Sequence, residues 1–378
     1  MKIGIIGGGQ LGKMMTLEAK KMGLHVIVLD PAKNCPSHSI SDEHIVAGFD
    51  DAAAIKELAA KSDVVTYEFE HIGAGPLIEL EAAGCKIFPT AKSLKVIQDK
   101  LTQKQALKEG GAPVGEFAGV GSAAEVEACG KVFGYPLMLK ARTGGYDGKG
   151  NFLVKSPGEV AGACQVLQRG AAALMVEKFV DFEMEISVLA CRTESGQTTV
   201  YPVGQNNHAD SILSETRVPA SISAETRVLA LNTALQVMDV FKGVGMFCTE
   251  MFVLKDGGIL INEVAPRPHN SGHYSIEGCV TSQFENHVRA VCGLPLGDTS
   301  LLLPVVMRNI LGSDIESRGR AVVDGLDRAL AVEGVKVHIY GKEESQHKRK
   351  MGHLTVMADT LELAAERAGE AWSQIKIY

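Results

Sequence analysis

The chain has 378 residues, of which 46% are hydrophobic and 22% charged, and its formal net charge is −7; this is an ordinary globular composition for two or three domains. The acidic balance argues against non-specific binding of nucleic acid, and no apolar run approaches the ~20 residues that a membrane span requires. Eight cysteines lack Cys-x-x-Cys pairs or zinc spacing, and the N-terminus enters a strand without a signal peptide, so we expect a cytoplasmic protein with reduced thiols.

The first elements form a β-α-β unit around a glycine-rich turn. An apolar strand at 2–6 leads into residues 7–12, which fit the pattern G-x-G-x-x-G, and a helical pattern connects them to a second strand at 25–30. Asp30 lies near the position of a ribose-binding acid, so the unit predicts a Rossmann-like domain. The pattern indicates a phosphate at a helix N-terminus but not which one, and an NAD-dependent oxidoreductase stays open at this point.

Further α/β units extend this Rossmann-like domain, which we expect to span 1–95. Glu68, Glu70 and His71 follow a strand at its carboxyl end, where open parallel sheets bind ligands, although a solvated loop is the alternative. A single helix is expected at 96–110, ended by two glycines.

From about residue 112 to 178 short strands alternate with single helices, which predicts a small α+β lid subdomain. Lys140 ends one of its strands, four glycines fall within residues 144–150, and Lys149 lies among them. Such a loop can wrap an anion with successive N–H groups and is suited to close over a polyphosphate. A surface hairpin with two solvated lysines is the alternative, and the spacing is not that of a Walker loop.

Two later strands are joined by a turn at 255–258 and predict a hairpin. If the turn is centred between residues 256 and 257, Glu250 faces Glu263, and a shift by one residue breaks this pairing. Facing carboxylates are destabilising without a cation between them, and Mg²⁺ prefers one or two carboxylates together with nucleotide phosphates. The hairpin therefore predicts a magnesium site, with Asn262 adding a neutral oxygen beside it; the alternative is that two glutamates are paired by chance on a solvent-exposed face.

The rest of the chain is expected to complete a central domain at 96–300 and to form a small β-rich domain at 301–378. A polar, turn-rich loop occupies 266–273, and a basic run at 347–350 lies between two C-terminal strands. The basic run is either a solvated turn or a source of charge-assisted hydrogen bonds to a phosphate.

These features, in this order, resemble the ATP-grasp fold: an α/β and α+β protein with an N-terminal Rossmann-like (pre-ATP-grasp) parallel sheet and a small C-terminal β-rich domain. More closely, nearly the whole chain resembles the 5-(carboxyamino)imidazole ribonucleotide synthetase family, which includes the ATPase subunit of phosphoribosylaminoimidazole carboxylase. The residues that carry the resemblance are the runs 7–14, 67–70, 140–142, 145–150, 262–273 and 349–353. One departure is Lys100, where the family pattern has arginine, so a bidentate ATP contact there is in doubt.

The resemblance implies that ATP lies between the small subdomain and the larger sheet, with Mg²⁺ on Glu250 and Glu263. The residues implied to contact ATP are Lys100, Lys140, Gly145, Tyr146, Asp147, Gly148, Lys149, Gly150, Asn151, Glu177, Lys178, Phe179, Val180, Glu185, His208, Asn262 and Glu263.

The resemblance also implies a reaction in which ATP phosphorylates bicarbonate and the resulting carboxyphosphate yields carbon dioxide to the amine of 5-aminoimidazole ribonucleotide. The implied catalytic residues are Tyr146, Asp147, Lys149 and Arg267, and the implied acceptor-binding residues are Gln10, Leu11, Glu68, Lys342 and Arg349. A homodimer is expected, with neither nucleic acid nor membrane as a partner. The alternatives are another ATP-grasp ligase such as formate-dependent glycinamide ribonucleotide transformylase, the NAD-dependent oxidoreductase, and a nucleotide-binding regulator without turnover.

Overall fold

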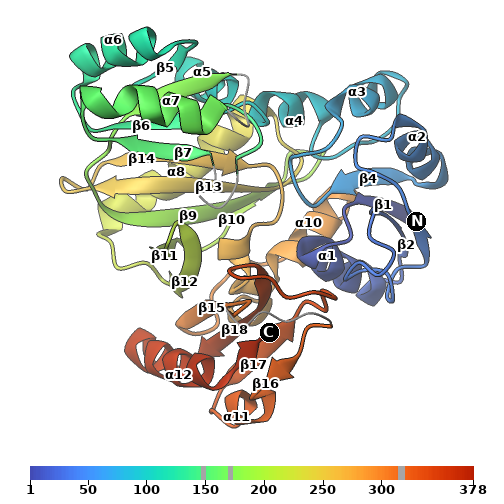
Figure 1. Ribbon diagram of the computed structural model, residues 1–378. Coiled ribbons are helices and arrows are strands. Elements are labelled where there is room, and N and C mark those ends of the chain that lie inside the picture. The colour runs from blue at the N-terminus through green and yellow to red at the C-terminus, as the bar shows by residue number, and fades with distance from the viewer. Residues whose placement is uncertain (146–149, 169–172, 314–319) are drawn as a thin grey trace.

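The computed structural model describes residues 1–145, 150–168, 173–313 and 320–378. They form an N-terminal part, a central part that consists of the lid subdomain and most of the largest sheet, and a C-terminal part, and these three parts meet near the middle of the molecule (Figure 1). The first part is a parallel sheet in the order β3-β2-β1-β4. Its elements are β1 (Lys2–Ile6), α1 (Gln10–Lys21), β2 (His25–Leu29), β3 (Glu43–Ile45), α2 (Ala52–Lys61), β4 (Val64–Tyr67) and α3 (Ala74–Ala82). Both faces of this sheet are covered, so β1 is almost continuously apolar: Ile5 packs in one core and Ile6 in another.

Two helices, α4 (Ala91–Ile97) and α5 (Lys100–Glu109), follow where the sequence predicted one helix at 96–110. That prediction was wrong because Asp99 interrupts the run. The Asp99 carboxylate accepts hydrogen bonds from the backbone N–H groups of Leu101 (3.0 Å) and Thr102 (3.2 Å), so it caps a new helix. The interruption turns Lys100 and the rest of α5 toward the central sheet.

The predicted lid subdomain is a separate four-stranded antiparallel sheet in the order β5-β8-β6-β7. Its elements are β5 (Phe117–Val120), α6 (Ala123–Phe133), β6 (Leu137–Ala141), β7 (Asn151–Val154), η1 (Pro157–Glu159), α7 (Val160–Gln168) and β8 (Leu174–Lys178). Helices α6 and α7 supply Val126 and Val160 to the core that Leu137 and Leu139 of β6 line. Tyr146, Asp147, Gly148 and Lys149, at the centre of the glycine loop between β6 and β7, lie outside the described residues.

The largest sheet is antiparallel and runs β14-β13-β9-β11-β12-β15-β18-β17, with β10 paired to β9. Its strands are β9 (Phe182–Arg192), β10 (Thr198–Val200), β11 (Gly204–Ala209), β12 (Ile212–Val218), β13 (Gly245–Leu254), β14 (Ile259–Ala265), β15 (Val305–Leu311), β17 (Val335–Ile339) and β18 (Lys350–Met357). Helix α8 (Ala224–Phe241) covers one face, where Ala234 and Met238 pack against Phe247 and Met251 of β13.

The C-terminal part extends this same sheet, because β12 pairs with β15 and β15 with β18. It is less exclusively β than the sequence suggested. Besides β16 (Val323–Asp324) and β19 (Lys376–Ile377), it contains α11 (Leu326–Leu330) and α12 (Leu361–Gln374), whose alanines pack on the sheet. Thr360 begins α12 by accepting a hydrogen bond from the N–H of Leu363.

The segment between β14 and β15 joins the three parts. It contains η2 (Asn270–Gly272), α9 (Ser275–Gly278) and α10 (Gln283–Val291). Phe284 and Val288 of α10 share one core with Ile3 and Met15 of the first part and Tyr340 of the last, which fixes the parts around a common centre. Within the described ranges, no helix combines the length and apolar character that crossing a membrane requires.

Candidate active site

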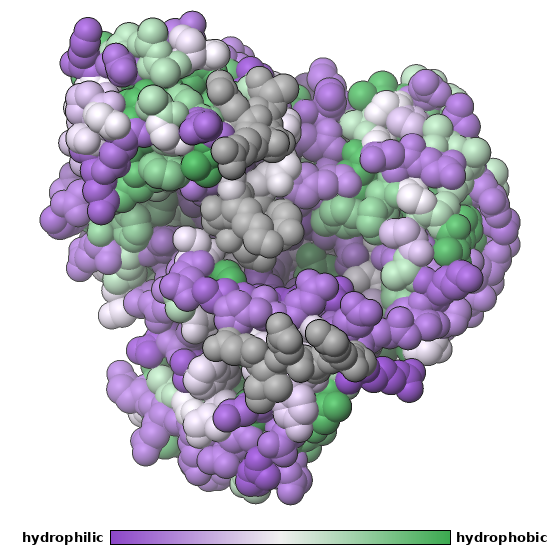
Figure 2. All heavy atoms as spheres, in the orientation of Figure 1, coloured by the Kyte–Doolittle hydropathy of each residue, from purple (hydrophilic) through white to green (hydrophobic). Residues whose placement is uncertain are grey.

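A cleft of about 1150 Å³ opens where the three parts meet, and hydrophilic residues dominate the surface along this boundary (Figure 2). Residues far apart in the sequence line it together. The lining residues that the sequence had singled out for a site are Gln10, Leu11, Glu68, Lys100, Gly145, Asn151, Glu185, His208, Glu250, Asn262, Glu263, Arg267, Lys342 and Arg349.

The predicted pairing of Glu250 with Glu263 is present in the register of β13 and β14. The turn, however, is not centred where the sequence placed it. Leu254 and Gly258 close a three-residue loop, with the N–H of Leu254 donating to the carbonyl of Gly258 (2.8 Å). This one-residue shift is cancelled by a bulge, because Asn262 is an extra residue on β14 without a partner in the register.

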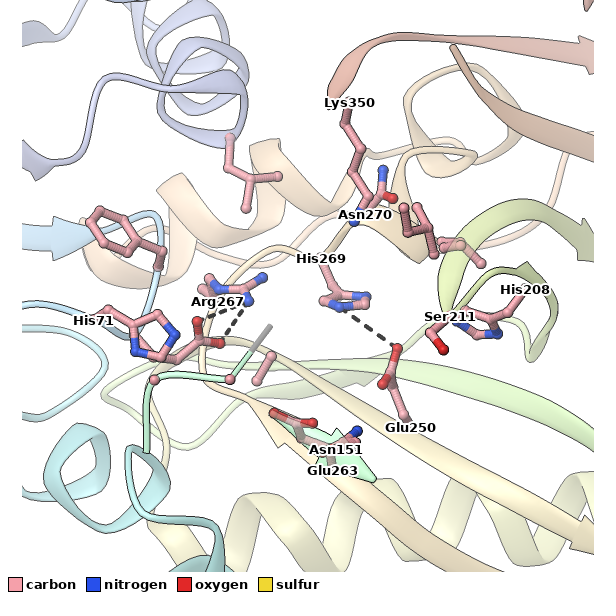
Figure 3. Close-up of a pocket in the computed structure, with 18 of the residues that line it drawn as sticks. His71, Asn151, His208, Ser211, Glu250, Glu263, Arg267, His269, Asn270 and Lys350 are labelled. Atoms are coloured by element: carbon pink, nitrogen blue, oxygen red, sulfur yellow. Dashed lines mark hydrogen bonds and ion pairs between the residues drawn. The ribbon is translucent and has the colours of Figure 1, made fainter. Parts of the chain in front are cut away.

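The two facing carboxylates differ in their electrostatics. Burial raises the pKa of Glu250 to about 7, and the negative charges of Glu263 and Glu185 add to this effect. Burial acts on Glu263 in the same direction, but Lys100 Nζ lies 2.7 Å from Glu263 Oε1 and keeps the pKa of Glu263 below its usual range. Glu250 is therefore the member of the pair that has no lysine or arginine within ion-pair distance among the described residues. His269 Nε2 lies 3.7 Å from Glu250 Oε1 (Figure 3), but burial lowers the pKa of this imidazole well below its ordinary value.

These oxygens suit a hard cation. Among the described residues, no three His, Cys, Asp or Glu side chains gather into a metal-binding group, so Glu250 and Glu263 would need further oxygens from a ligand. Mg²⁺ is commonly held in this way, by one or two carboxylates and the phosphates of a nucleotide. The raised pKa of Glu250 is the sign of a buried anionic site that a cation would relieve.

A second group of charges connects the lid subdomain to the same strand. Lys140 Nζ lies 3.0 Å from Glu177 Oε2 and 3.4 Å from Asn262 Oδ1. Lys104, which the sequence analysis missed, lies 3.7 Å from Glu177 Oε1, and burial lowers the pKa of Lys104 to about 8. The sequence feature that could have identified Lys104 is its spacing: it lies three residues after Leu101 and three before Leu107, and both leucines are buried on α5.

Several residues implied to contact ATP lie outside the main cleft. Lys178, Phe179 and Val180 line a second pocket of about 270 Å³, together with Leu260 and others. Lys140, Glu177 and Gly150 line neither pocket; Lys140 reaches the cleft residue Asn262 as described, whereas the carbonyl of Gly150 accepts a hydrogen bond from the N–H of Ala141. Glu185 and His208 do line the main cleft and contact each other, at 3.2 Å.

Arg267 follows the end of β14 and lines the cleft. Its guanidinium contacts both oxygens of Glu70, at 2.7 and 3.0 Å, as the dashed lines from Arg267 in Figure 3 show. The Nε of Arg267 is buried without a hydrogen-bond partner among the described residues. A donor left unsatisfied in a polar cleft suits an anionic ligand or a water molecule.

The glycine-rich turn does not hold a phosphate in the manner of a dinucleotide-binding loop. Glu68 Oε1 accepts a hydrogen bond from the N–H of Gly9 and Oε2 one from Gly12, both at 2.7 Å, while Asp30 Oδ2 accepts from Gly8 at 2.8 Å. A Cβ on Gly9 would lie 2.5 Å from the Glu68 carboxylate. The glycines therefore serve the close approach of the chain's own carboxylates, and Asp30 is not free for a ribose.

Glu68, which the resemblance assigned to the acceptor nucleotide, already accepts hydrogen bonds within the protein, and its role toward a ligand stays a prediction. Both of its oxygens are occupied, although the residue lines the cleft. The N–H groups of Gln10 and Leu11, at the start of α1, donate no hydrogen bond to the described part of the chain. They remain available for an anion, as predicted.

The C-terminal part also lines the cleft, through Lys342 and the basic run. Lys342 Nζ donates to Gln10 Oε1 (2.7 Å) and to the carbonyl of Lys350 (2.6 Å). Arg349 donates to the carbonyl of Glu344 at 2.9 Å and lines the cleft beside Lys350. The basic run is thus part of the site and not a distant solvated turn.

Comparison with known proteins first gives the class. Residues 105–284 match the ATP-grasp domain, residues 1–98 the ribonucleotide synthetase preATP-grasp domain, and residues 305–367 the phosphoribosylaminoimidazole carboxylase C-terminal domain. The fold and the cleft are therefore those of an ATP-grasp enzyme.

Whole-chain relatives then give the family. N5-carboxyaminoimidazole ribonucleotide synthase of Bacillus subtilis is 42% identical over 356 residues, covering 94% of this chain and 91% of that protein. Phosphoribosylaminoimidazole carboxylase of Schizosaccharomyces pombe is 41% identical, and this chain spans 65% of its length. The chain belongs to the N5-carboxyaminoimidazole ribonucleotide synthase family, whose members are ATP-dependent ligases that form carbon–nitrogen bonds.

Solved structures agree. The crystal structure of N5-carboxyaminoimidazole ribonucleotide synthetase from Thermotoga maritima has a TM-score of 0.90 and 46% identity, covering 100% of this chain and 99% of that one. The Aspergillus clavatus enzyme in complex with ADP and 5-aminoimidazole ribonucleotide has a TM-score of 0.91 and 35% identity, with 98% of each chain covered. The predicted fold and family are confirmed, whereas the individual site assignments and the domain limits at residues 95 and 300 stay predictions.

Proposed function

We propose that this chain uses ATP and bicarbonate to carboxylate the exocyclic amine of 5-aminoimidazole ribonucleotide, releasing ADP and phosphate in purine biosynthesis. The observation that carries the proposal is the facing pair Glu250 and Glu263 in a cleft that is also lined by Lys100, Arg267 and Arg349. An acidic pair for a metal, surrounded by cations for phosphates, is the charge pattern that phosphoryl transfer requires.

Magnesium would be held by Glu250 and Glu263, with Asn262 beside them. When bound, it would neutralise charge on the phosphates of the nucleotide. The chain's own contribution is the fixed opposition of the two carboxylates and the burial that makes Glu250 favour a cation.

Lys100 and Lys140 would bind ATP phosphates, together with the glycine loop from Gly145 to Asn151. Lys100 faces Glu263, and Lys140 contacts Asn262, so both cations are held within the range of the acidic pair. The pocket lined by Lys178, Phe179 and Val180 is a candidate for the adenine base, since it lies on the strand that carries Glu177 and offers apolar surface. Glu185 would bind the ribose hydroxyls, with His208 supporting it.

The reaction then balances in three steps. An oxygen of bicarbonate attacks the γ-phosphorus of ATP, and ADP leaves. The carboxyphosphate breaks its bond between carbon and the bridging oxygen, which gives carbon dioxide and phosphate. The amine nitrogen of the acceptor bonds to carbon and releases a proton. Tyr146, Asp147, Lys149 and Arg267 are the residues we assign to this chemistry, with Arg267 positioned by Glu70.

The acceptor nucleotide would lie against the first and last parts of the chain. The N–H groups of Gln10 and Leu11 and the side chains of Lys342 and Arg349 are suited to its phosphate. Glu68 would stabilise this subsite indirectly, because its carboxylate accepts hydrogen bonds from the N–H groups of Gly9 and Gly12 in the glycine turn. Because carboxyphosphate hydrolyses readily, a loop that excludes water would protect it.

The deciding experiment measures ADP formation with ATP, magnesium, bicarbonate and 5-aminoimidazole ribonucleotide, omitting each in turn. ADP formation that requires the acceptor supports the proposal, whereas turnover with glycinamide ribonucleotide and formate in its place would favour the transformylase. Glu263→Gln should nearly abolish turnover and leave the circular dichroism spectrum unchanged; an unchanged rate would remove Glu263 from the metal site. A homodimer is a further part of the proposal, tested by light scattering, and the expected cytoplasmic location stays a prediction.

A further inference from the structure

Asn262 and Glu263 are consecutive on β14, and the side chains of both reach lysines at the cleft: Asn262 Oδ1 lies 3.4 Å from Lys140 Nζ, and Glu263 Oε1 lies 2.7 Å from Lys100 Nζ. In a regular strand, consecutive side chains point to opposite faces of the sheet. The bulge at Asn262 is what allows both to reach one side. The position of Glu263 opposite Glu250 therefore depends on this bulge remaining in one register.

Strand β14 is the last strand of the large sheet, so no further strand of that sheet pairs with its outer edge. Among the described residues, its outer edge meets one isolated bridge, from Val114 to Ile261. An edge strand with a bulge and only one flanking ladder is the part of a sheet most prone to slip.

Two consecutive residues of α5 hold the backbone on either side of the bulge. Lys104 Nζ donates to the carbonyl of Ile261 at 2.7 Å. Gln103 Oε1 accepts from the N–H of Val264 at 2.9 Å, and Gln103 Nε2 donates to the carbonyl of Val264 at 3.1 Å. The backbone groups that α5 binds belong to Ile261 and Val264, which are three residues apart. In a regular strand, the residues whose backbone groups point to one edge are two apart, so the bulge accounts for the extra residue.

Both side chains are buried, with 2% exposure for Gln103 and 4% for Lys104. Their hydrogen bonds are therefore not exchanged readily for water, and an unsatisfied edge would be costly. Gln103 replaces the neighbouring strand that β14 lacks, since one amide satisfies both backbone groups of Val264.

We infer that Gln103 is a positioning residue for this enzyme, which locks the bulge of β14 and thereby sets the distance of Glu263 from Glu250. The inference rests on the proposed function, because it takes that pair as the magnesium site. Gln103 itself does not line the cleft, so it acts through Glu263. Lys104 supports the same bulge from its other side.

The test is Gln103→Met, which keeps the volume of the side chain and removes the two hydrogen bonds to Val264, together with a longer one from Gln103 Nε2 to the carbonyl of Ile97 at 3.3 Å. Binding of ADP is measured by calorimetry as a function of magnesium concentration, and hydrogen exchange reports on the N–H of Val264. We expect the half-saturating magnesium concentration to rise by about tenfold, as for other residues that orient metal ligands. Exchange at Val264 should become faster, while the KM for the acceptor nucleotide should stay unchanged.

Two further variants separate positioning from general loosening. Gln103→Glu with a protonated carboxyl keeps an acceptor for the N–H of Val264 and an O–H donor for its carbonyl, and burial favours this neutral form, so its effect on magnesium should be smaller than that of Gln103→Met. Thr226→Val removes a bond to the same hairpin at its turn, where Thr226 Oγ1 donates to the carbonyl of Gly257 at 2.9 Å. It should lower the melting temperature without moving the magnesium dependence.

Normal magnesium dependence in a folded Gln103→Met variant would overturn the inference, and so would an equal shift in Thr226→Val. If Gln103→Met fails to fold, Gln103→Glu decides in the same assay. A wild-type chain that binds ADP and magnesium but shows no acceptor-dependent turnover would count against the proposed function alone, because the calorimetric comparison still decides the role of Gln103.

Discussion

Lys100 Nζ lies 2.7 Å from Glu263 Oε1, so a lysine at the start of α5 neutralises one member of the acidic pair on the β13–β14 hairpin. Lysine is a compact charge, whereas the arginine that the family resemblance led us to expect here offers a planar fork. We therefore predict that Lys100→Ala raises the KM for ATP by about tenfold to a hundredfold, the loss of one charged hydrogen bond.

Lys100→Arg should retain most of the activity, since the positive charge is kept beside Glu263. The measurement is steady-state kinetics at varied ATP, with Lys95→Ala, an exposed lysine of α4, as the control. A KM for ATP that does not change in Lys100→Ala would show that this lysine serves only the acidic pair.

The bond between Glu68 and the glycine turn gives a second prediction. Glu68→Gln replaces one acceptor by an NH₂ group that would face the N–H of Gly9 or Gly12. Leaving a buried donor unsatisfied costs about 1–3 kcal/mol, so urea unfolding should show a loss of this size. Because Gln10 and Leu11 follow directly, the KM for the acceptor should rise more than that for ATP. Wild-type stability would contradict the role given to Glu68.

Arg349 gives the third prediction, which concerns the basic run. Its guanidinium lines the cleft on the side of Gln10 and Lys342, so Arg349→Ala should raise the KM for the acceptor by about tenfold or more. The KM for ATP should change little. Arg328, which lies on α11 and not in the cleft, is the matched control. Equal effects of Arg349→Ala on both constants would refute the assignment.

The hairpin shows how far the sequence determines the site. Counting from a turn between residues 256 and 257 paired Glu250 with Glu263, and that pairing is present. The turn is nonetheless shifted by one residue, and the bulge at Asn262 restores the register. A bulge on an edge strand is held by tertiary contacts from α5, and these are not encoded in the local pattern of the two strands.

The glycine turn shows the opposite case. The pattern at residues 7–12 correctly predicted a β-α-β unit, because close backbone packing needs glycine whatever fills the space. It did not indicate the occupant. The carboxylate of Glu68, directly after β4 and 56 residues after Gly12, accepts hydrogen bonds from the N–H groups of this turn. Similarly, Lys104 was missed because its partners, Ile261 and Glu177, are distant in sequence.

The last prediction concerns pH and the joint between the first two parts. His287 is fully buried; its Nδ1 accepts from the N–H of Met246 at 3.0 Å, so Nε2 carries the proton and donates to Thr66 Oγ1 at 2.8 Å. Burial lowers the pKa of His287 to about 3, from an ordinary value of 6.5. As pH falls below 6.5, His287 becomes protonated in the unfolded chain but stays neutral in the folded chain. Stability is therefore full above pH 6.5 and falls between pH 6.5 and 3, by up to about 1.4 kcal/mol per pH unit.

His269, His273 and His353 add to this slope, because burial also lowers the pKa of each. His287→Gln isolates one contribution, since glutamine can accept from Met246 and donate to Thr66 without titrating. Urea unfolding from pH 7.5 to 4.5 should then show a slope that is shallower by about one proton. The same slope in both proteins would mean that His287 becomes protonated in the folded chain, and that the joint between β4 and β13 opens before the protein unfolds.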